Sequence, residues 1–225
     1  MLDLGLDVLF KGKNMARLLG GLGVALKISA VSVIISLPLG ILLGVLMTSR
    51  NPVIKAVLRL YLEFVRIMPQ MVLLFLVYFG TTRAFGWNLS GETASIIVFV
   101  LWGTAEMSDL VRGALIAIPK HQYESAEALG MNRWQTMRYI ILPQAMSTSM
   151  PAFMANVIFL LKETSVFSAI SLMDLMFTAK DLIGLYYKTP ECLFLLVVFY
   201  LIILLPVSIV GSLIERRLRY AGFGS

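Results

Sequence analysis

The sequence has very little cysteine, histidine and charge. Cys192 is its only cysteine and His121 its only histidine in 225 residues. A single cysteine excludes an intrachain disulfide and a cysteine-based zinc site, and one isolated histidine offers no metal-binding or catalytic cluster. Charged residues make up 14% of the chain, whereas an average soluble domain has roughly 25%. The composition therefore argues against a disulfide-rich, metal-binding or ordinary soluble protein.

Apolar residues dominate the chain. They account for 59% of it, and the mean hydropathy is +0.86. About five helices of ~20 residues, the length that crosses a bilayer, fit in a chain of this size. We therefore expect an all-α integral membrane protein with one transmembrane domain over residues 1–225. The net charge of +6 is typical of basic loops held on the cytoplasmic side rather than of nucleic-acid binding.

Apolar runs predict five transmembrane helices. The last run has no charge, whereas the third carries charged residues near its end, and the second is short with Pro69 near its start. Gly40 and Gly44 in the first run have the GxxxG spacing that lets helix backbones approach closely. The expected spans are 28–49, 67–82, 93–118, 151–173 and 192–214.

The distribution of Lys and Arg predicts the orientation of these spans. The successive connections carry four, one, four and two basic residues, and the C-terminal tail carries three. Because basic loops are retained in the cytoplasm, this alternation favours a cytoplasmic C-terminus and an N-terminus outside. Lys11, Lys13 and Arg17 oppose that orientation, and an amphipathic N-terminal segment at the outer interface would reconcile them with it.

A polar, helix-forming segment at about 119–143 separates the third and fourth spans. Pro119 ends the preceding helix, and good helix formers follow it. Its apolar and small residues recur at steps of three and four, which predicts short cytoplasmic helices with one exposed face. Small side chains at Ala126 and Gly130 would let a partner approach closely. The recurring residues are Tyr123, Ala126, Gly130, Trp134, Met137 and Ile141.

The same segment resembles a known motif. Glu124, Ala126 and Gly130, followed by Ile140 and Leu142-Pro143, match the spacing E-x-A-x3-G-x9-I-x-L-P. This is similar to the EAA loop of the permease subunits of ATP-binding-cassette (ABC) importers, with Ser125 in place of the usual alanine.

Three further segments resemble the permeases for polar amino acids of the histidine, glutamine and arginine type. They are YLEFVRIMPQMVLLFLVYFG at 61–80, the acidic-x-x-Arg-Gly segment at 109–113, and Lys-Glu-Thr-Ser at 162–165, where the group has Lys-Asp-Thr-Ser. Asp109 stands where the group usually has glutamate.

The resemblance implies a type I importer permease in a bacterial inner membrane, a transport subunit rather than an enzyme. It implies two ATPase subunits that carry ATP and Mg²⁺, a second permease chain, identical or similar, an extracytoplasmic substrate-binding protein and an amino acid as the transported solute. The sequence has no G-x-x-x-x-G-K-[ST] phosphate loop, so hydrolysis by that route requires a partner. The residues expected to couple to the ATPase are Tyr123, Glu124, Ser125, Ala126, Glu127, Ala128, Leu129 and Gly130.

Charges within the expected spans are candidates for the substrate path. Glu106, Asp109 and Arg112 recur at i, i+3 and i+6 and share one helical face. They either line a translocation cavity or form an ion pair that fixes helix packing, because charged groups in a bilayer face protein or water. A second set, residues 162–165, either binds the two charges of an amino acid or holds two helices together through polar contacts. The substrate-path candidates are Met68, Glu106, Asp109, Lys162, Glu163, Thr164 and Ser165.

Two alternatives to this function remain. The same machinery could carry another small solute, such as methionine, cystine or an opine. An ion-driven secondary transporter is a different class, and it would show internal repeats and interrupted helices at matching positions. No repeat is evident, and five spans do not divide into two equal halves. No catalytic, cofactor-binding or metal-binding residues are expected in this chain.

Overall fold

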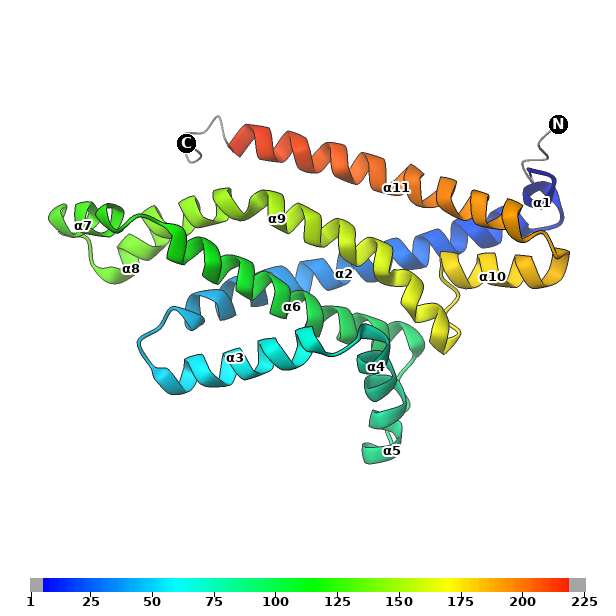
Figure 1. The fold of residues 1–225 in the computed structure, drawn as a ribbon, viewed down its shortest axis with the longest axis horizontal. Coiled ribbons are helices and arrows are strands. Elements are labelled where there is room, and N and C mark those ends of the chain that lie inside the picture. Colours follow the sequence, from blue (N-terminus) through cyan, green and yellow to red (C-terminus); the bar gives the residue numbers. More distant parts are fainter. Residues whose placement is uncertain (1–5, 219–225) are drawn as a thin grey trace. The chain divides into compact units, whose positions relative to one another are not determined.

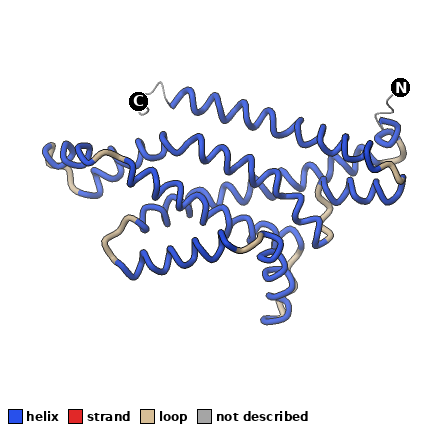
Figure 2. The backbone as a smooth tube through the Cα atoms, in the orientation of Figure 1, coloured by secondary structure: helices blue, strands red, loops and turns tan. Residues whose placement is uncertain are grey.

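The computed structural model describes residues 6–218, and every regular element of those residues is a helix (Figures 1 and 2). The first half contains α1 (Leu6–Phe10), α2 (Asn14–Met47), α3 (Pro52–Ile67), α4 (Gln70–Phe75), the π-helix η1 (Leu76–Gly80), α5 (Thr81–Phe85) and α6 (Gly91–Ala117). The second half contains α7 (Lys120–Ala128), α8 (Arg133–Gln135), the π-helix η2 (Thr136–Ile141), α9 (Leu142–Glu163), the 3-10 helix η3 (Thr164–Ile170), α10 (Leu175–Tyr186) and α11 (Thr189–Leu218). The predicted all-α class is confirmed.

Four helical stretches are long and apolar enough to cross a membrane. They are Asn14–Met47, Gly91–Ala117, Arg133–Ile170 and Thr189–Arg217. The pair Pro52–Ile67 and Gln70–Phe85, interrupted at Met68 and Pro69, makes a fifth if it is counted as one span. The structure thus agrees with the expectation of about five spans, while several boundaries differ.

Contacts within the chain group its residues into two units. The first contains the described residues up to Ile34 together with Met68–Val100 and Val157–Val207. The second contains Ile35–Ile67, Leu101–Asn156 and the described residues from Ser208 onward. The expectation of one transmembrane domain over residues 1–225 stays a prediction.

The core of the first unit joins the first two helices to α10 and the beginning of α11. Apolar residues of α1, α2, α10 and α11 form one buried cluster. Polar contacts surround it: Asn14 donates hydrogen bonds to the Val8 carbonyl (2.8 Å) and to the Tyr186 hydroxyl (3.0 Å). Hydrogen bonds from Lys188 and Lys11 lower the pKa of Asp7 in α1. The cluster contains Val8, Leu9, Leu18, Leu175, Ala179, Leu182, Cys192, Leu195, Leu196 and Phe199.

Helix α2 begins at Asn14, well before residue 28, where the first uncharged run starts. Two of its basic residues have partners on other helices of the first unit. Arg17 pairs with Asp181 of α10, and Lys27 with Glu92 of α6 at 2.8 Å. The charges that lie before the expected span are therefore part of the same continuous helix.

In the second unit, α2 packs directly against α6 at the two glycines of its GxxxG sequence. A Cβ atom added at Gly40 would lie 2.5 Å from Met107 Cβ, and one at Gly44 would lie 2.6 Å from Val111 Cβ. The Ser36 hydroxyl also lies 3.6 Å from the Met107 sulfur. The predicted close approach of backbones is confirmed, since no larger residue fits without a shift.

The fourth span begins earlier than residue 151. Pro143 and Pro151 lie within the helical stretch Arg133–Ile170 rather than at its ends. Prolines are tolerated in membrane helices where the freed backbone groups find other partners. A π-helical stretch, η2, ends two residues before Pro143.

A buried carboxylate begins α10. Asp174 is 0% exposed, and its Oδ1 accepts a hydrogen bond from the Phe177 backbone N–H at 2.8 Å, the arrangement of an N-cap. Its other carboxylate oxygen has no hydrogen-bond partner among the described residues. Burial raises the pKa of Asp174 to about 6.

Candidate functional site

The segment expected to couple to an ATPase contains a short helix, α7, between two candidate spans. Pro119 occupies the N-cap position, two residues after α6 ends. One face of α7 packs inward, because Ala126 is 2% exposed and Tyr123 is partly buried. Burial raises the pKa of the Tyr123 phenol, so that side chain stays neutral. The segment is short, polar and anchored on one side.

The opposite face of α7 is open to solvent. Glu124, Ser125 and Ala128 are exposed, and Leu129, directly after the helix, is 79% exposed. An exposed leucine beside polar helix residues is a suitable contact for a partner protein. Ala126, by contrast, faces inward and is not on the exposed surface where a partner's close approach was expected.

Gly130 terminates α7 through a backbone turn. Its φ is +76°, and its N–H bonds the Glu127 carbonyl at 2.9 Å while the Met131 N–H bonds the Ala126 carbonyl at 3.0 Å. This pair of bonds is the Schellman motif, which needs a left-handed residue and therefore favours glycine. The sequence interpretation attributed this glycine to partner contact, and the turn gives it a conformational role.

The apolar stripe predicted along residues 123–141 does not run along one helix. The chain leaves the helix after Ala128 and starts again at Arg133, where Asn132 and Gln135 form a reciprocal capping box. Periodicity at steps of three and four cannot reveal this interruption, because Gly130 fits the repeat while ending the helix.

A side-chain contact ties α7 to the following long helix. The Gln144 amide of α9 donates a hydrogen bond to the Gln122 Oε1 of α7 at 3.2 Å. Lys120 and Glu124 also pair along α7 at 3.3 Å. Helix α7 is thus joined to α9 by this hydrogen bond and to α6 by the two residues that separate them.

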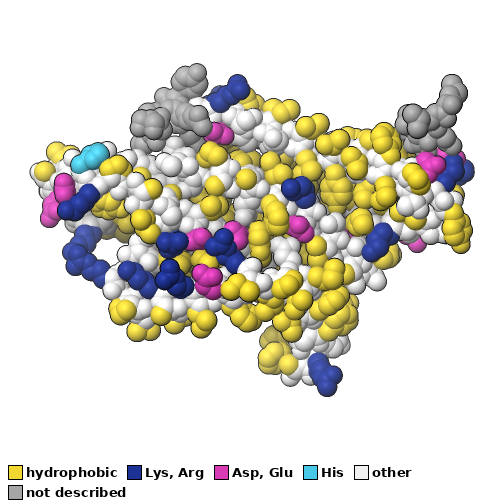
Figure 3. Space-filling model, viewed as in Figure 1, with side chains coloured by type: hydrophobic (Ala, Val, Ile, Leu, Met, Phe, Trp, Pro, Cys, Tyr) yellow, Lys and Arg dark blue, Asp and Glu magenta, His cyan; other side chains and the backbone are white. Residues whose placement is uncertain are grey.

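A cluster of four charges connects α3 and α6 in the second unit. The guanidinium of Arg66 contacts Glu106 at 2.7 Å and Asp109 at 2.8 Å, and Asp109 contacts Arg112 at 2.6 Å. These side chains are 20–38% exposed. Figure 3 shows basic and acidic side chains intermixed over α3 and α6. We refer to these four residues as the Arg66 cluster.

The cluster confirms the expected ion pair between Asp109 and Arg112 and adds a residue that the sequence interpretation missed. Arg66 was counted among the basic residues of a connection and lies in the segment 61–80 that resembles the permeases, but no ion pair was assigned to it, although it bridges both acidic candidates. Forty residues separate Arg66 from Glu106, so helical spacing gave no signal. The only hint in the sequence was that Arg112 lies one turn from Asp109, whereas Glu106 has no basic residue within one turn of α6.

The second set of candidate residues lies in the first unit, at the junction of α9 and η3. Lys162 is exposed and lies 6.0 Å from the centre of the Phe159 ring. Thr164 is fully buried and donates to the Leu161 carbonyl at 3.0 Å. Glu163 and Ser165 are partly exposed. This geometry fits packing for Thr164 and leaves the Lys162 ammonium accessible.

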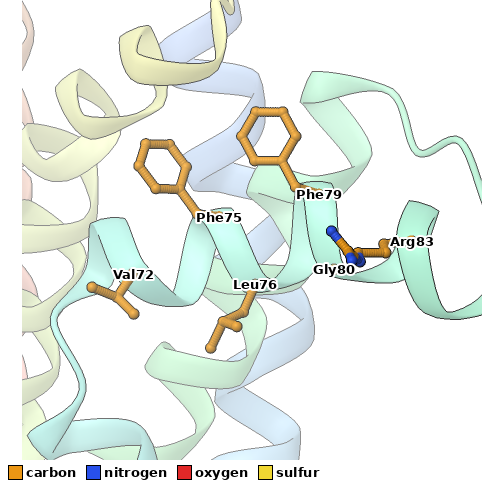
Figure 4. Close-up of a pocket in the computed structure, with 6 residues that line it drawn as sticks. All are labelled: Val72, Phe75, Leu76, Phe79, Gly80 and Arg83. Atoms are coloured by element: carbon orange, nitrogen blue, oxygen red, sulfur yellow. The ribbon is translucent and has the colours of Figure 1, made fainter.

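Met68 lies at the break between α3 and α4 and is partly exposed. The helices after this break contain an open apolar cavity of about 380 Å³ in the first unit. Figure 4 shows Phe75 and Phe79 pointing to one side, Leu76 pointing to the other, and Arg83 near one end. The apolar lining of this cavity suits a lipid chain or another helix.

Among the residues that the structure describes, no group of histidine, cysteine and acidic side chains could hold a metal ion.

Known proteins share this sequence and fold. Residues 36–220 match the family described as "Binding-protein-dependent transport system inner membrane component". The arginine transport system permease protein ArtQ of Bacillus subtilis is 32% identical over 202 residues, covering 90% of this chain and 92% of ArtQ. The glutamate/glutamine/aspartate/asparagine transport system permease protein BztC of Rhodobacter capsulatus is 37% identical over 160 residues. That match covers 69% of this chain and 36% of BztC, so the chain corresponds to about a third of that longer protein.

A solved structure agrees with these matches. A chain of an amino acid ABC transporter crystallised with histidines is 31% identical, with a TM-score of 0.84, covering 91% of this chain and 95% of that one. The match to the family model spans most of the sequence, including all of α7 and the Arg66 cluster. The chain therefore belongs to the family of inner-membrane components of binding-protein-dependent transport systems.

Proposed function

We propose that this chain is the permease subunit of an ABC importer for polar amino acids. The names of its relatives support this substrate class, because ArtQ is a permease for arginine and BztC one for glutamate, glutamine, aspartate and asparagine. The composition agrees with such a role, since the chain offers several membrane helices and few charged residues. It forms the membrane path, and the energy comes from a separate protein.

In this proposal, α7 is the contact between the permease and its ATPase. Two ATPase subunits bind ATP and Mg²⁺, and each receives the exposed face of one α7 at Glu124, Ser125 and Leu129. A second permease chain completes the solute path, and an extracytoplasmic binding protein delivers the amino acid. When the ATPases close, α7 moves and carries α6 and α9 with it, through Pro119 and through the bond between Gln122 and Gln144. Packed helices respond to such a movement by switching between two arrangements.

The proposed orientation has α7 and the C-terminus in the cytoplasm and the N-terminus outside. The basic residues of the connections support it. Both chain ends, residues 1–5 and 219–225, lie outside the described residues, so this orientation rests on the connections alone.

The candidates for the substrate path are charged residues in each unit. In the second unit, Glu106 and Asp109 are acidic groups suited to an ammonium or guanidinium. In the first unit, Lys162 suits a carboxylate. Arg66 holds both acids in place and sets how much of their charge faces the path. Glu163, Ser165 and Met68 are further candidates because each is partly exposed, whereas buried Thr164 acts through packing.

The observation that carries the proposal is α7 itself: a short polar helix, anchored on one face and open on the other, between two candidate spans. Its test is co-purification of the ATPase with the permease. Leu129→Glu should abolish co-purification without lowering the melting temperature, because Leu129 is 79% exposed. The matched control is Trp87→Glu, at a residue 61% exposed in a different connection.

The comparison between the two variants shows whether a new negative charge must lie next to α7 to prevent ATPase binding. Equal loss of the ATPase in both variants, or full retention in Leu129→Glu, would contradict docking on α7. Substitution of Gly130 is a poorer test, because any side chain there strains the turn that ends the helix.

A further inference from the structure

A second cavity, of about 990 Å³, lies within the second unit. One wall is the end of α2 with the residues after it, and the other is the segment from α7 to η2. Both walls contain apolar side chains, among them Val45, Leu46, Met131 and Met137. We call it the α2–α7 cavity. Its volume is at the upper end of the range of small-molecule sites, which is about 300–1,000 Å³.

The cavity also holds two guanidinium groups that have no protein partner among the described residues. Arg50 and Arg133 line it from opposite walls, and both are exposed. No ion pair or side-chain hydrogen bond joins either guanidinium to another residue of the described chain. Ser49 also lines the space, but its hydroxyl oxygen is buried and so is not counted among the possible ligands. The two guanidinium groups suit a phosphate, which arginine binds in a bidentate manner.

A free inorganic anion does not account for the remaining features. Glu127 lines the cavity too, and its negative charge opposes an anion but attracts an ammonium. The apolar wall would stay unfilled around a small ion. A ligand with a phosphate, a nearby ammonium and an apolar part satisfies all three features.

The position of the cavity in the sequence points to a lipid as this ligand. Its first wall lies at the end of the uncharged run 28–49, which has the length of one membrane crossing and stops at Arg50. This wall therefore lies near the membrane–water boundary, where phospholipid headgroups are found. Basic residues next to membrane helices attract these headgroups.

We propose that the α2–α7 cavity binds the headgroup of a zwitterionic phospholipid of the phosphatidylethanolamine type. Its phosphate contacts Arg50 and Arg133, its ammonium contacts Glu127, and its glycerol region lies against the apolar wall. Because the second wall includes α7, the lipid links the end of α2 to the segment proposed to dock the ATPase. Only this last link rests on the proposed function, since lipid binding needs no ATPase.

The test is native mass spectrometry of the full-length chain, purified in detergent without an ATPase, with added phosphatidylethanolamine. The variant Arg50→Gln/Arg133→Gln should retain roughly tenfold less lipid, as expected from losing about 1.4 kcal/mol of binding free energy. The matched control, Lys55→Gln/Arg59→Gln, removes two exposed charges of α3 that do not line the cavity, and it should retain lipid like the parent. Arg50→Lys/Arg133→Lys keeps both charges, and an intermediate loss is expected.

Two further measurements distinguish the ligand's parts. Glu127→Gln should shift preference from phosphatidylethanolamine towards phosphatidylglycerol, whose headgroup lacks an ammonium, and an unchanged ratio would overturn the zwitterionic assignment. Displacement of the lipid by millimolar inorganic phosphate would identify a free-anion site instead. Equal lipid retention in the Arg50→Gln/Arg133→Gln and control variants would overturn the proposal altogether.

Discussion

Replacing Arg66 by methionine tests whether the Arg66 cluster holds α3 against α6. Methionine keeps much of the side-chain volume and removes both charged contacts, at 2.7 Å to Glu106 and 2.8 Å to Asp109. A hydrogen bond to a charged group contributes about 1.5–3 kcal/mol when shielded from water. These side chains are 20–38% exposed, and solvent screening reduces such contributions towards the range of surface pairs, about 0–1 kcal/mol each.

We therefore expect Arg66→Met to lower the free energy of unfolding by about 1–2 kcal/mol in total. For a chain of this size, that corresponds to a fall in melting temperature of roughly 2–8 °C. The measurement is thermal unfolding of the detergent-purified protein in low salt. The control is Arg59→Met on the same helix, which removes an exposed arginine without an ion pair in the described part of the chain and should shift melting by much less.

A double-mutant cycle separates the pair from general effects of the substitution. Arg66→Met and Glu106→Gln, combined, should cost less than the sum of the two single changes, because each removes the same contact. The reasoning is refuted if the two effects add within error, or if Arg66→Met melts like Arg59→Met.

Three other predictions concern stability. Gly44→Ala should destabilise the protein by about 1–3 kcal/mol, since the added Cβ would lie 2.6 Å from Val111 Cβ. The control is Gly23→Ala on the same helix, whose added Cβ meets no atom within 4 Å. It should be neutral or slightly stabilising in the same thermal unfolding measurement. Asp174→Asn should raise the melting temperature at pH 7.5. The carboxyl is protonated in the folded state up to about pH 6, and its ionisation above that pH destabilises the fold by at most about 3 kcal/mol. The difference in melting temperature between the variant and the parent should disappear below about pH 4. Gly130→Ala should cost about 1–2 kcal/mol from its left-handed backbone, read by thermal unfolding, and a loss below 0.5 kcal/mol would show that the turn relaxes freely.

The direction for Asp174 follows from proton binding. Its folded-state pKa of about 6 exceeds the ordinary value of 3.8, so between these pH values the folded chain binds a proton that the unfolded chain has lost. Stability from this group therefore falls as pH rises through that window. Asparagine keeps the oxygen that accepts from the Phe177 N–H, and removes only the buried charge.

The sequence predicted the order of the membrane helices, and it predicted their number if the bent pair Pro52–Ile67 and Gln70–Phe85 is counted as one span. Long apolar runs are a strong signal for such helices. The run at 192–214 lies entirely within α11 (Thr189–Leu218). Boundaries were less predictable where charges or prolines occur. Lys27 marked the limit of an uncharged run, yet its pairing with Glu92 lets α2 continue through it, and a pairing across 65 residues leaves no trace in local composition.

The candidate site was predictable to a similar extent. The motif around Glu124 located the segment that contains α7, and helical spacing paired Asp109 with Arg112. Helical spacing did not reveal that Ala126 faces inward or that Gly130 ends the helix, since both residues fit the same repeat of three and four residues. The sequence could not identify Arg66 as the partner of both acids, because that pairing depends on how α3 packs against α6.

The buried Cys192 makes the protein a convenient scaffold for site-directed probes. Cys192 is 2% exposed within the first unit's core, so thiol reagents should react little with the protein even when the native cysteine is kept. A cysteine introduced by His121→Cys on α7, or by Trp87→Cys between α5 and α6, would then react alone. Labelling intact cells with a maleimide that does not cross the bilayer would report which of these two connections meets each aqueous compartment.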